Sequence, residues 1–113
     1  MNMNFSKIFL ILFMILFIGC TNMPTPVSQI VGSYTSDLKY KDSTCEDLGK
    51  EINNLARRES QLVLAQESRI KTSERQAFWF GYGQGDGVEA SELAVVRGEQ
   101  NAVRSAIENK DCK

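Results

Sequence analysis

The chain has 113 residues, with 13 Lys plus Arg against 14 Asp plus Glu, and it contains no histidine. This length leaves room for one small domain with a limited hydrophobic core, so we expect an additional constraint on the fold. The near-neutral charge argues against a nucleic-acid partner, and the lack of histidine removes the commonest general base and metal ligand, so we expect neither catalysis nor a metal or other cofactor.

Residues 1–19 have the organisation of a bacterial signal peptide. A short polar start with one cation, Lys7, leads into the apolar stretch 8–18, and Gly19 precedes Cys20. Such a stretch is short for a helix that must cross roughly 30 Å of hydrocarbon. We therefore predict a signal peptide that is cleaved before Cys20, with an uncleaved signal anchor or cleavage at another position as the alternatives.

The sequence Phe-Ile-Gly-Cys at 17–20 resembles the lipobox of bacterial lipoproteins. The resemblance implies that the Cys20 thiol receives diacylglycerol and that the new amino terminus is acylated, for example with palmitate. Several acyl chains give a durable membrane anchor, because each buried methylene contributes about 0.8 kcal/mol. Thr21 stands where enterobacterial lipoproteins of the inner membrane carry aspartate. We therefore expect a cell-envelope protein, on the periplasmic face of the outer membrane if the host is Gram-negative.

Residues 20–42 are predicted to comprise the lipidated cysteine, a linker and an irregular segment. Pro24 and Pro26 lie among small and polar residues, a composition that favours an extended linker over a packed segment. The rest of this segment follows neither the helical nor the strand period. We expect its Tyr34 and Tyr40 to cover the base of the domain that follows.

A first helix is predicted from about Thr44 to about residue 76. Ser43 or Thr44 is a suitable N-cap, and acidic residues follow in the first turn, where the helix dipole favours negative charge. Apolar residues recur at three-four spacing in the first half of this helix. In its second half, polar residues stand where this spacing requires apolar ones, at Glu59, Gln66 and Arg69. We expect helix packing that weakens in this direction.

Glycine occupies every second position of one short stretch, at residues 81, 83, 85 and 87. This density excludes a continuous helix, and we predict a flexible turn. A second helical pattern begins near residue 89 or 91 and continues toward Cys112, with Gly98 inside it either allowing a close approach or loosening the helix. Residues 43–113 are therefore predicted to form an all-α domain, an antiparallel two-helix hairpin.

Cys45 and Cys112 lie at the outer ends of the two predicted helices. If they pair, antiparallel helices place residues whose numbers add up to about 157 opposite one another, which puts the turn next to the glycine run. This agreement predicts a Cys45–Cys112 disulfide, as an oxidising compartment would allow. A loop of this length would give a chain-entropy stabilisation of about 4 kcal/mol, which supplies the constraint that the short chain requires.

Four aromatic residues stand close together at the predicted turn, namely Phe78, Trp79, Phe80 and Tyr82. In the interpretation that we prefer, they fold back over the two predicted helices near the turn and supply the apolar packing that is missing there. In the other, they form an exposed tip that contacts a partner protein or a membrane interface, where Trp and Tyr are frequent. Because the disulfide and the linker are expected at the opposite end, the tip should point away from the lipid by up to roughly 40 to 50 Å.

The remaining patterns have ordinary interpretations. The glycine run lacks the third glycine and the preceding strand of a dinucleotide-binding loop. Charged residues on both helices are expected to form solvated faces with local ion pairs, among them Arg57, Arg58, Glu59, Glu89, Glu92 and Glu99. No nucleophile, base or metal cluster is visible, and no small-molecule substrate is suggested.

Several motifs resemble a family of small uncharacterised proteobacterial lipoproteins. They are Tyr-Thr-Ser at 34–36, Cys-Glu-Asp-Leu at 45–48, Phe-Trp-Phe at 78–80, Arg-Gly-Glu at 97–99 and Lys-Asp-Cys at 110–112. The resemblance covers nearly the whole chain after the signal peptide and implies the hairpin, but it brings no known activity. We expect a membrane-anchored protein with a structural or partner-binding role at the envelope. The alternative is an exclusion- or immunity-type lipoprotein that inhibits an envelope protein.

Overall fold

The computed structural model describes residues 5–15 and 22–113. These residues form three α-helices, α1 (Phe5–Ile15), α2 (Cys45–Phe80) and α3 (Val88–Asn109), and two short 3-10 helices, η1 (Val27–Gln29) and η2 (Asp37–Tyr40). They contain no strand, so the predicted all-α class is confirmed for this part of the chain. No helix within it combines the length and the apolar character needed to cross a bilayer.

Helix α2 begins where the sequence predicts and ends one turn later than predicted. Thr44 is its N-cap, and the hydroxyl oxygen of Thr44 accepts a hydrogen bond from the backbone N–H of Asp47 at 3.1 Å. The helix then continues for 36 residues. It ends at Gly81, whose φ of 82° suits a residue without a Cβ and whose N–H donates to the carbonyl of Ala77.

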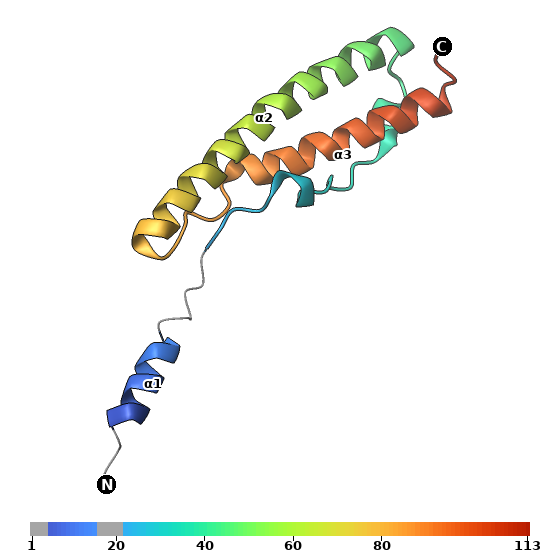
Figure 1. Ribbon diagram of the computed structural model, residues 1–113. Coiled ribbons are helices and arrows are strands. Elements are labelled where there is room, and N and C mark those ends of the chain that lie inside the picture. Colours follow the sequence, from blue (N-terminus) through green and yellow to red (C-terminus); the bar gives the residue numbers. More distant parts are fainter. Residues whose placement is uncertain (1–4, 16–21) are drawn as a thin grey trace.

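Helices α2 and α3 lie side by side, with the chain reversing direction between them (Figure 1). A disulfide joins Cys45, the first residue of α2, to Cys112, just beyond α3, with 5.6 Å between their Cα atoms. The predicted pairing of these cysteines is therefore confirmed. The core between the helices lies in the half next to this disulfide, and its buried members are Tyr40, Leu48, Leu55, Val96, Ala102, Val103 and Ala106.

Residues 22–41 lie against α2 and α3. The extended linker predicted for residues 21–29 is therefore wrong for its described residues 22–29, which are packed. Three apolar side chains of this segment are buried, those of Pro24, Ile30 and Tyr40. The backbone N–H of Ser33 donates to the carbonyl of Ala94 at 2.8 Å. The guanidinium of Arg97 donates to the carbonyl of Val27 at 2.8 Å and to that of Ile30. Residues of α3 thus bind polar backbone groups of this segment.

Of the two tyrosines expected to cover the base of the domain, only Tyr40 does so. Tyr40 is 7% exposed and belongs to the core, whereas Tyr34 is 93% exposed. The prediction for Tyr34 is wrong because the backbone of its neighbour Ser33 takes the position against α3.

Gly98 marks the place where residues 32–33 cross α3. A Cβ atom at Gly98 would overlap the carbonyl oxygen of Ser33, and a Cβ atom at Gly32 would lie 2.8 Å from the backbone nitrogen of Gly98. Two backbones therefore touch at this point. Of the two roles considered for Gly98, close approach is the one observed, and the segment that approaches is the irregular one rather than α2.

Gly98→Ala should lower the free energy of unfolding by about 1–3 kcal/mol, because the added methyl group forces residues 32–33 away from α3. Gly49→Ala is the matched control, since Gly49 lies in α2 with no atom within 4 Å of its added Cβ. This control should stabilise the protein by about 0.5–1 kcal/mol through helix propensity. Urea denaturation of both variants measures the difference, and equal effects would contradict the crossing described here.

Candidate functional site at the aromatic end of α2

The predicted site residues fall at different places in the structure. Cys20, the predicted lipid attachment point, lies outside the described residues. The Cys45–Cys112 disulfide lies at the N-terminal end of α2. The four aromatic residues lie at the other end of this helix and in the loop after it, about 54 Å away for 36 helical residues. We refer to Phe78, Trp79, Phe80 and Tyr82 as the aromatic tip.

The side chains of the aromatic tip are exposed. Their exposed fractions are 80% for Phe78, 75% for Trp79, 72% for Phe80 and 64% for Tyr82. The rings of Phe78 and Trp79 contact each other edge to face, with 5.2 Å between their centroids. The preferred interpretation, that these residues cover the helices near the turn, is therefore wrong. Polar residues of α2 occupy buried positions in this part of the molecule instead.

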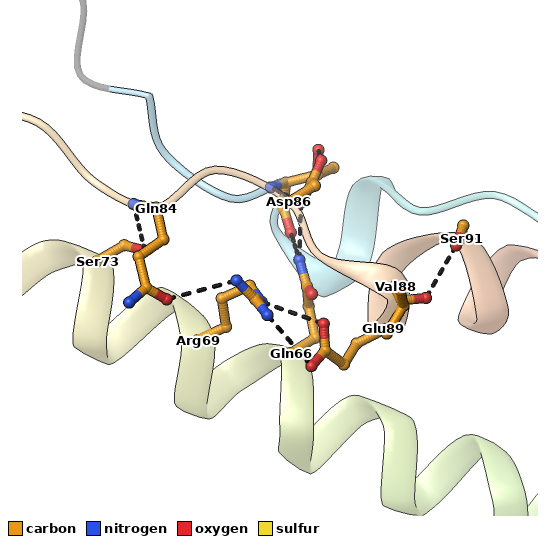
Figure 2. A network of polar contacts seen from close by, with 9 residues as sticks. Gln66, Arg69, Ser73, Gln84, Asp86, Val88, Glu89 and Ser91 are labelled. Carbon is orange, nitrogen blue, oxygen red and sulfur yellow. Dashed lines mark hydrogen bonds and ion pairs between the residues drawn. The ribbon is translucent and has the colours of Figure 1, made fainter.

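Polar contacts take the place of an apolar core along the C-terminal half of α2, the half next to the aromatic tip. Gln66 is fully buried, and its Nε2 donates to the carbonyl oxygen of Thr25 at 2.9 Å and to the carboxylate of Asp86 at 3.0 Å. Asp86 also accepts hydrogen bonds from the backbone N–H of Thr25 at 2.6 Å and from its hydroxyl. Figure 2 shows Gln66 reaching from α2 toward Asp86 in the loop. We call Thr25, Gln66 and Asp86 the Asp86 cluster; it joins three segments that are distant in the sequence.

The glycine-rich loop 81–87 lies along α2 (Figure 2). The backbone N–H of Gln84 donates to the hydroxyl of Ser73 at 3.2 Å, and the side chain of Gln84 accepts from Arg69 at 3.4 Å. Arg69 also donates to Glu89, in the first turn of α3, at 3.1 Å. The chain reverses direction at this run, as predicted, and the loop that makes the turn is packed against α2 by these contacts.

Gly83 and Gly85 allow Asn22, where the second described segment begins, to approach this loop. A Cβ atom at Gly83 would lie 2.8 Å from the carbonyl oxygen of Asn22 and 2.9 Å from the Cβ of Ser73. At Gly85 it would lie 2.6 Å from the side-chain amide of Asn22, and the N–H of Gly85 donates to the Asn22 carbonyl at 2.7 Å. The chain therefore enters beside the aromatic half of α2. The expected orientation, with the tip pointing away from the entry point, is wrong.

Several charged residues predicted to be solvated with local partners instead join different elements. Ion pairs connect Glu59 with Arg97 at 2.8 Å, Glu89 with Arg69 at 3.1 Å and Glu99 with Lys39 at 2.6 Å. The hydrogen bond from Arg97 lowers the pKa of Glu59, and the hydrogen bond to Glu99 raises the pKa of Lys39. These charges hold segments together, so the prediction of local pairs is wrong for them.

Comparison of the chain with protein-family models, curated proteins and solved structures finds no match. Among residues 5–15 and 22–113, no group of three or more His, Cys, Asp or Glu side chains is placed to hold a metal ion. The features that stand out at this end are therefore the exposed aromatic tip and the polar contacts that fix the entering chain beside it.

The carboxylate of Asp86 is stabilised in its charged form. The hydrogen bond from the Thr25 hydroxyl is the main cause that lowers the pKa of Asp86 below its usual value, and the Thr25 N–H, Gln66 and Arg69 act in the same direction. Because the pKa is lower in the folded than in the unfolded protein, this group contributes stability above the unfolded pKa. The contribution is lost as the pH falls through the folded pKa.

Asp86→Asn should lower the free energy of unfolding by a constant amount near neutral pH, and the gap to the wild type should shrink as the pH falls below about 4. Urea denaturation of both proteins over a pH series measures this gap. Asp42→Asn is the control, because the Asp42 carboxylate has no hydrogen-bond partner among the described residues, and its gap should be small throughout. A gap for Asp86→Asn that did not change with pH would contradict the role of the charged carboxylate.

Proposed function

We propose that this chain is a bacterial lipoprotein of the cell envelope, cleaved before Cys20 and anchored by lipid on that cysteine. The observation that carries the proposal is α1, which coincides with the apolar stretch and ends five residues before Cys20. The large apolar side chains of its residues 8–14 are all exposed and contribute nothing to the core. An apolar helix with exposed side chains outside the core cluster, followed by a lipobox-like sequence, fits a signal peptide.

The disulfide supports an extracytoplasmic location, because such bonds persist in oxidising compartments. Thr21 after Cys20 favours the periplasmic face of the outer membrane in a Gram-negative host. The motifs shared with small proteobacterial lipoproteins agree with this placement.

In this proposal, α2 and α3 form an antiparallel two-helix hairpin with a structural or partner-binding role. Two features support this arrangement: the disulfide that joins the start of α2 to the end of α3, and the loop 81–87, where the chain reverses direction. The pairs Glu59–Arg97 and Arg69–Glu89 support it as well, since their residue numbers lie close to the expected sum of 157. A role without catalysis is supported by the use of these charged side chains, and of Asp86, in contacts between segments. The partner that we propose is an envelope protein.

Intact-mass analysis of the protein extracted from membranes tests the anchor. We expect residues 1–19 to be absent and Cys20 to carry a diacylglyceryl group and an amide-linked acyl chain, and reduction should add the mass of two hydrogen atoms from Cys45–Cys112. Cys20→Ser should remain unprocessed and carry no lipid, and Cys45→Ser with Cys112→Ser should keep the lipid. An unmodified Cys20 in the wild type would overturn the proposal.

A partner-binding role predicts that crosslinking of intact cells recovers a specific envelope protein with the wild-type chain. Cys20→Ser, which lacks the anchor, should recover less of it because the two proteins no longer share a membrane. Quantitative mass spectrometry of the purified complexes, with an unrelated lipoprotein as the control, measures the enrichment. Recovery of the same proteins with the unrelated lipoprotein would argue for a structural role instead.

A further inference from the structure

The aromatic tip and the entry point of the chain lie at the same end of α2. Asn22 lies beside Ser73, which precedes Phe80 by seven residues, or about 10 Å along the helix. Asn22 follows Cys20 by two residues, so the chain between them spans at most about 7 Å. A lipid on Cys20 is therefore confined to the neighbourhood of the aromatic tip.

The entry point is held in place by the surrounding contacts. The carbonyl of Asn22 accepts a hydrogen bond from the N–H of Gly85, and Thr25 donates hydrogen bonds to Asp86 from both its N–H and its hydroxyl. Pro24, between them, is buried. The position of the anchor relative to the tip is thus set by the fold. The segment from Asn22 onward is packed and does not act as a flexible linker that would let the tip turn away from the lipid.

The distribution of side chains on α2 is inverted near this end. Gln66 and Ser73 are fully buried, whereas Phe78, Trp79 and Phe80 on the same helix are at least 72% exposed. On α2, the fold therefore buries two polar side chains in this region and leaves three large aromatic side chains outside. An exposed apolar patch of this kind marks a surface that contacts another phase or molecule.

The directions of the aromatic side chains favour a membrane over a protein partner. Successive residues of an α-helix point about 100° apart, so Phe78, Trp79 and Phe80 spread over about 200° around the end of α2. A protein surface that contacts one side of this end would cover only part of them. A lipid–water interface surrounds the end and contacts all three, and it is the environment in which Trp and Tyr are enriched.

Given the lipid attachment to Cys20 that we propose, we infer that the aromatic tip inserts into the interface of the membrane that holds this lipid. Lipid and aromatic side chains then contact the bilayer together, at one end of the α2–α3 pair. The disulfide end is directed away from the membrane, by up to about 54 Å if α2 stands upright.

Trp79 is the only tryptophan of the chain, and its fluorescence tests this inference without a label. The mature lipidated protein is reconstituted into vesicles of phosphatidylethanolamine with a minor fraction of phosphatidylglycerol, with or without bromine on the acyl chains near the headgroups. We expect brominated lipid to reduce the emission of Trp79 and the bilayer to protect it from acrylamide in the water. Phe78→Ser with Phe80→Ser should weaken both effects while leaving the melting temperature unchanged, since both side chains are exposed.

The matched control moves the indole to the other end of the molecule. Trp79→Phe keeps an aromatic tip, and Leu38→Trp in the same chain places the only indole on η2, where position 38 is exposed next to Lys110 near the disulfide end. Its emission should be reduced by acrylamide and not by brominated lipid.

Intact-mass analysis of the same sample separates failure of this inference from failure of the lipoprotein proposal. If Cys20 is lipidated and Trp79 is quenched only by acrylamide, the tip does not enter the membrane and the inference falls while the lipoprotein proposal stands. Protection of Trp79 from both quenchers would show that a protein, such as a second copy of the chain, covers the tip, and it would also overturn the inference. An unmodified Cys20 would remove the anchor and the inference together.

Discussion

The carboxylate of Asp86 determines how the half of the α2–α3 pair next to the aromatic tip is assembled. It accepts hydrogen bonds from Thr25, near the start of the segment 22–41, and from Gln66 in the interior of α2, so that this segment, the long helix and the returning loop meet at one group. A buried amide such as that of Gln66 costs about 1–3 kcal/mol if its hydrogen bonds are not made. The loop and the segment 22–41 must therefore take up compatible positions, and these positions decide at which end of the α2–α3 pair residue 22 lies.

The two halves of the α2–α3 pair are stabilised by different kinds of interaction. Next to the disulfide, aliphatic side chains of both helices form a core that depends on volume and shape. Toward the aromatic tip, hydrogen bonds and ion pairs between specific partners replace it. Arg97 lies at the boundary, where it binds Glu59 of α2 and the carbonyls of Val27 and Ile30. Since Gln66 and Ser73 occupy buried positions of α2 in this half, together with Leu93 of α3, the aromatic residues of the tip remain outside the fold and available for other contacts.

Local patterns in the sequence predicted an N-cap at Ser43 or Thr44, the two long helices and the cysteine pair, because each of these depends on neighbouring residues or on a simple register. The packing of residues 22–41 and the entry point depend on contacts such as Thr25 with Asp86, between residues 61 apart in the sequence, which leave no periodic signal. One signal was present but misread. At Gly83 and Gly85 the missing side chain leaves room for Asn22, so these two glycines mark a close approach of another segment and not only a place where the chain turns. The exposure of the tip could not be predicted, since apolar residues next to a polar seam are expected to fill it.

Residues 22–41 run along the length of the α2–α3 pair, from Asn22 beside the glycine-rich loop to Asp37, which accepts a hydrogen bond from Asn109 at 2.8 Å. This path has a mechanical consequence. A force that pulls on residue 22 while the disulfide end is held loads the segment in shear, parallel to α3. Its bonds to Asp86, Ala94 and Arg97 then share the load instead of breaking one after another. The disulfide holds the ends of α2 and α3 together at the far end, so such a force would pass along the long axis of the α2–α3 pair instead of separating the two helices.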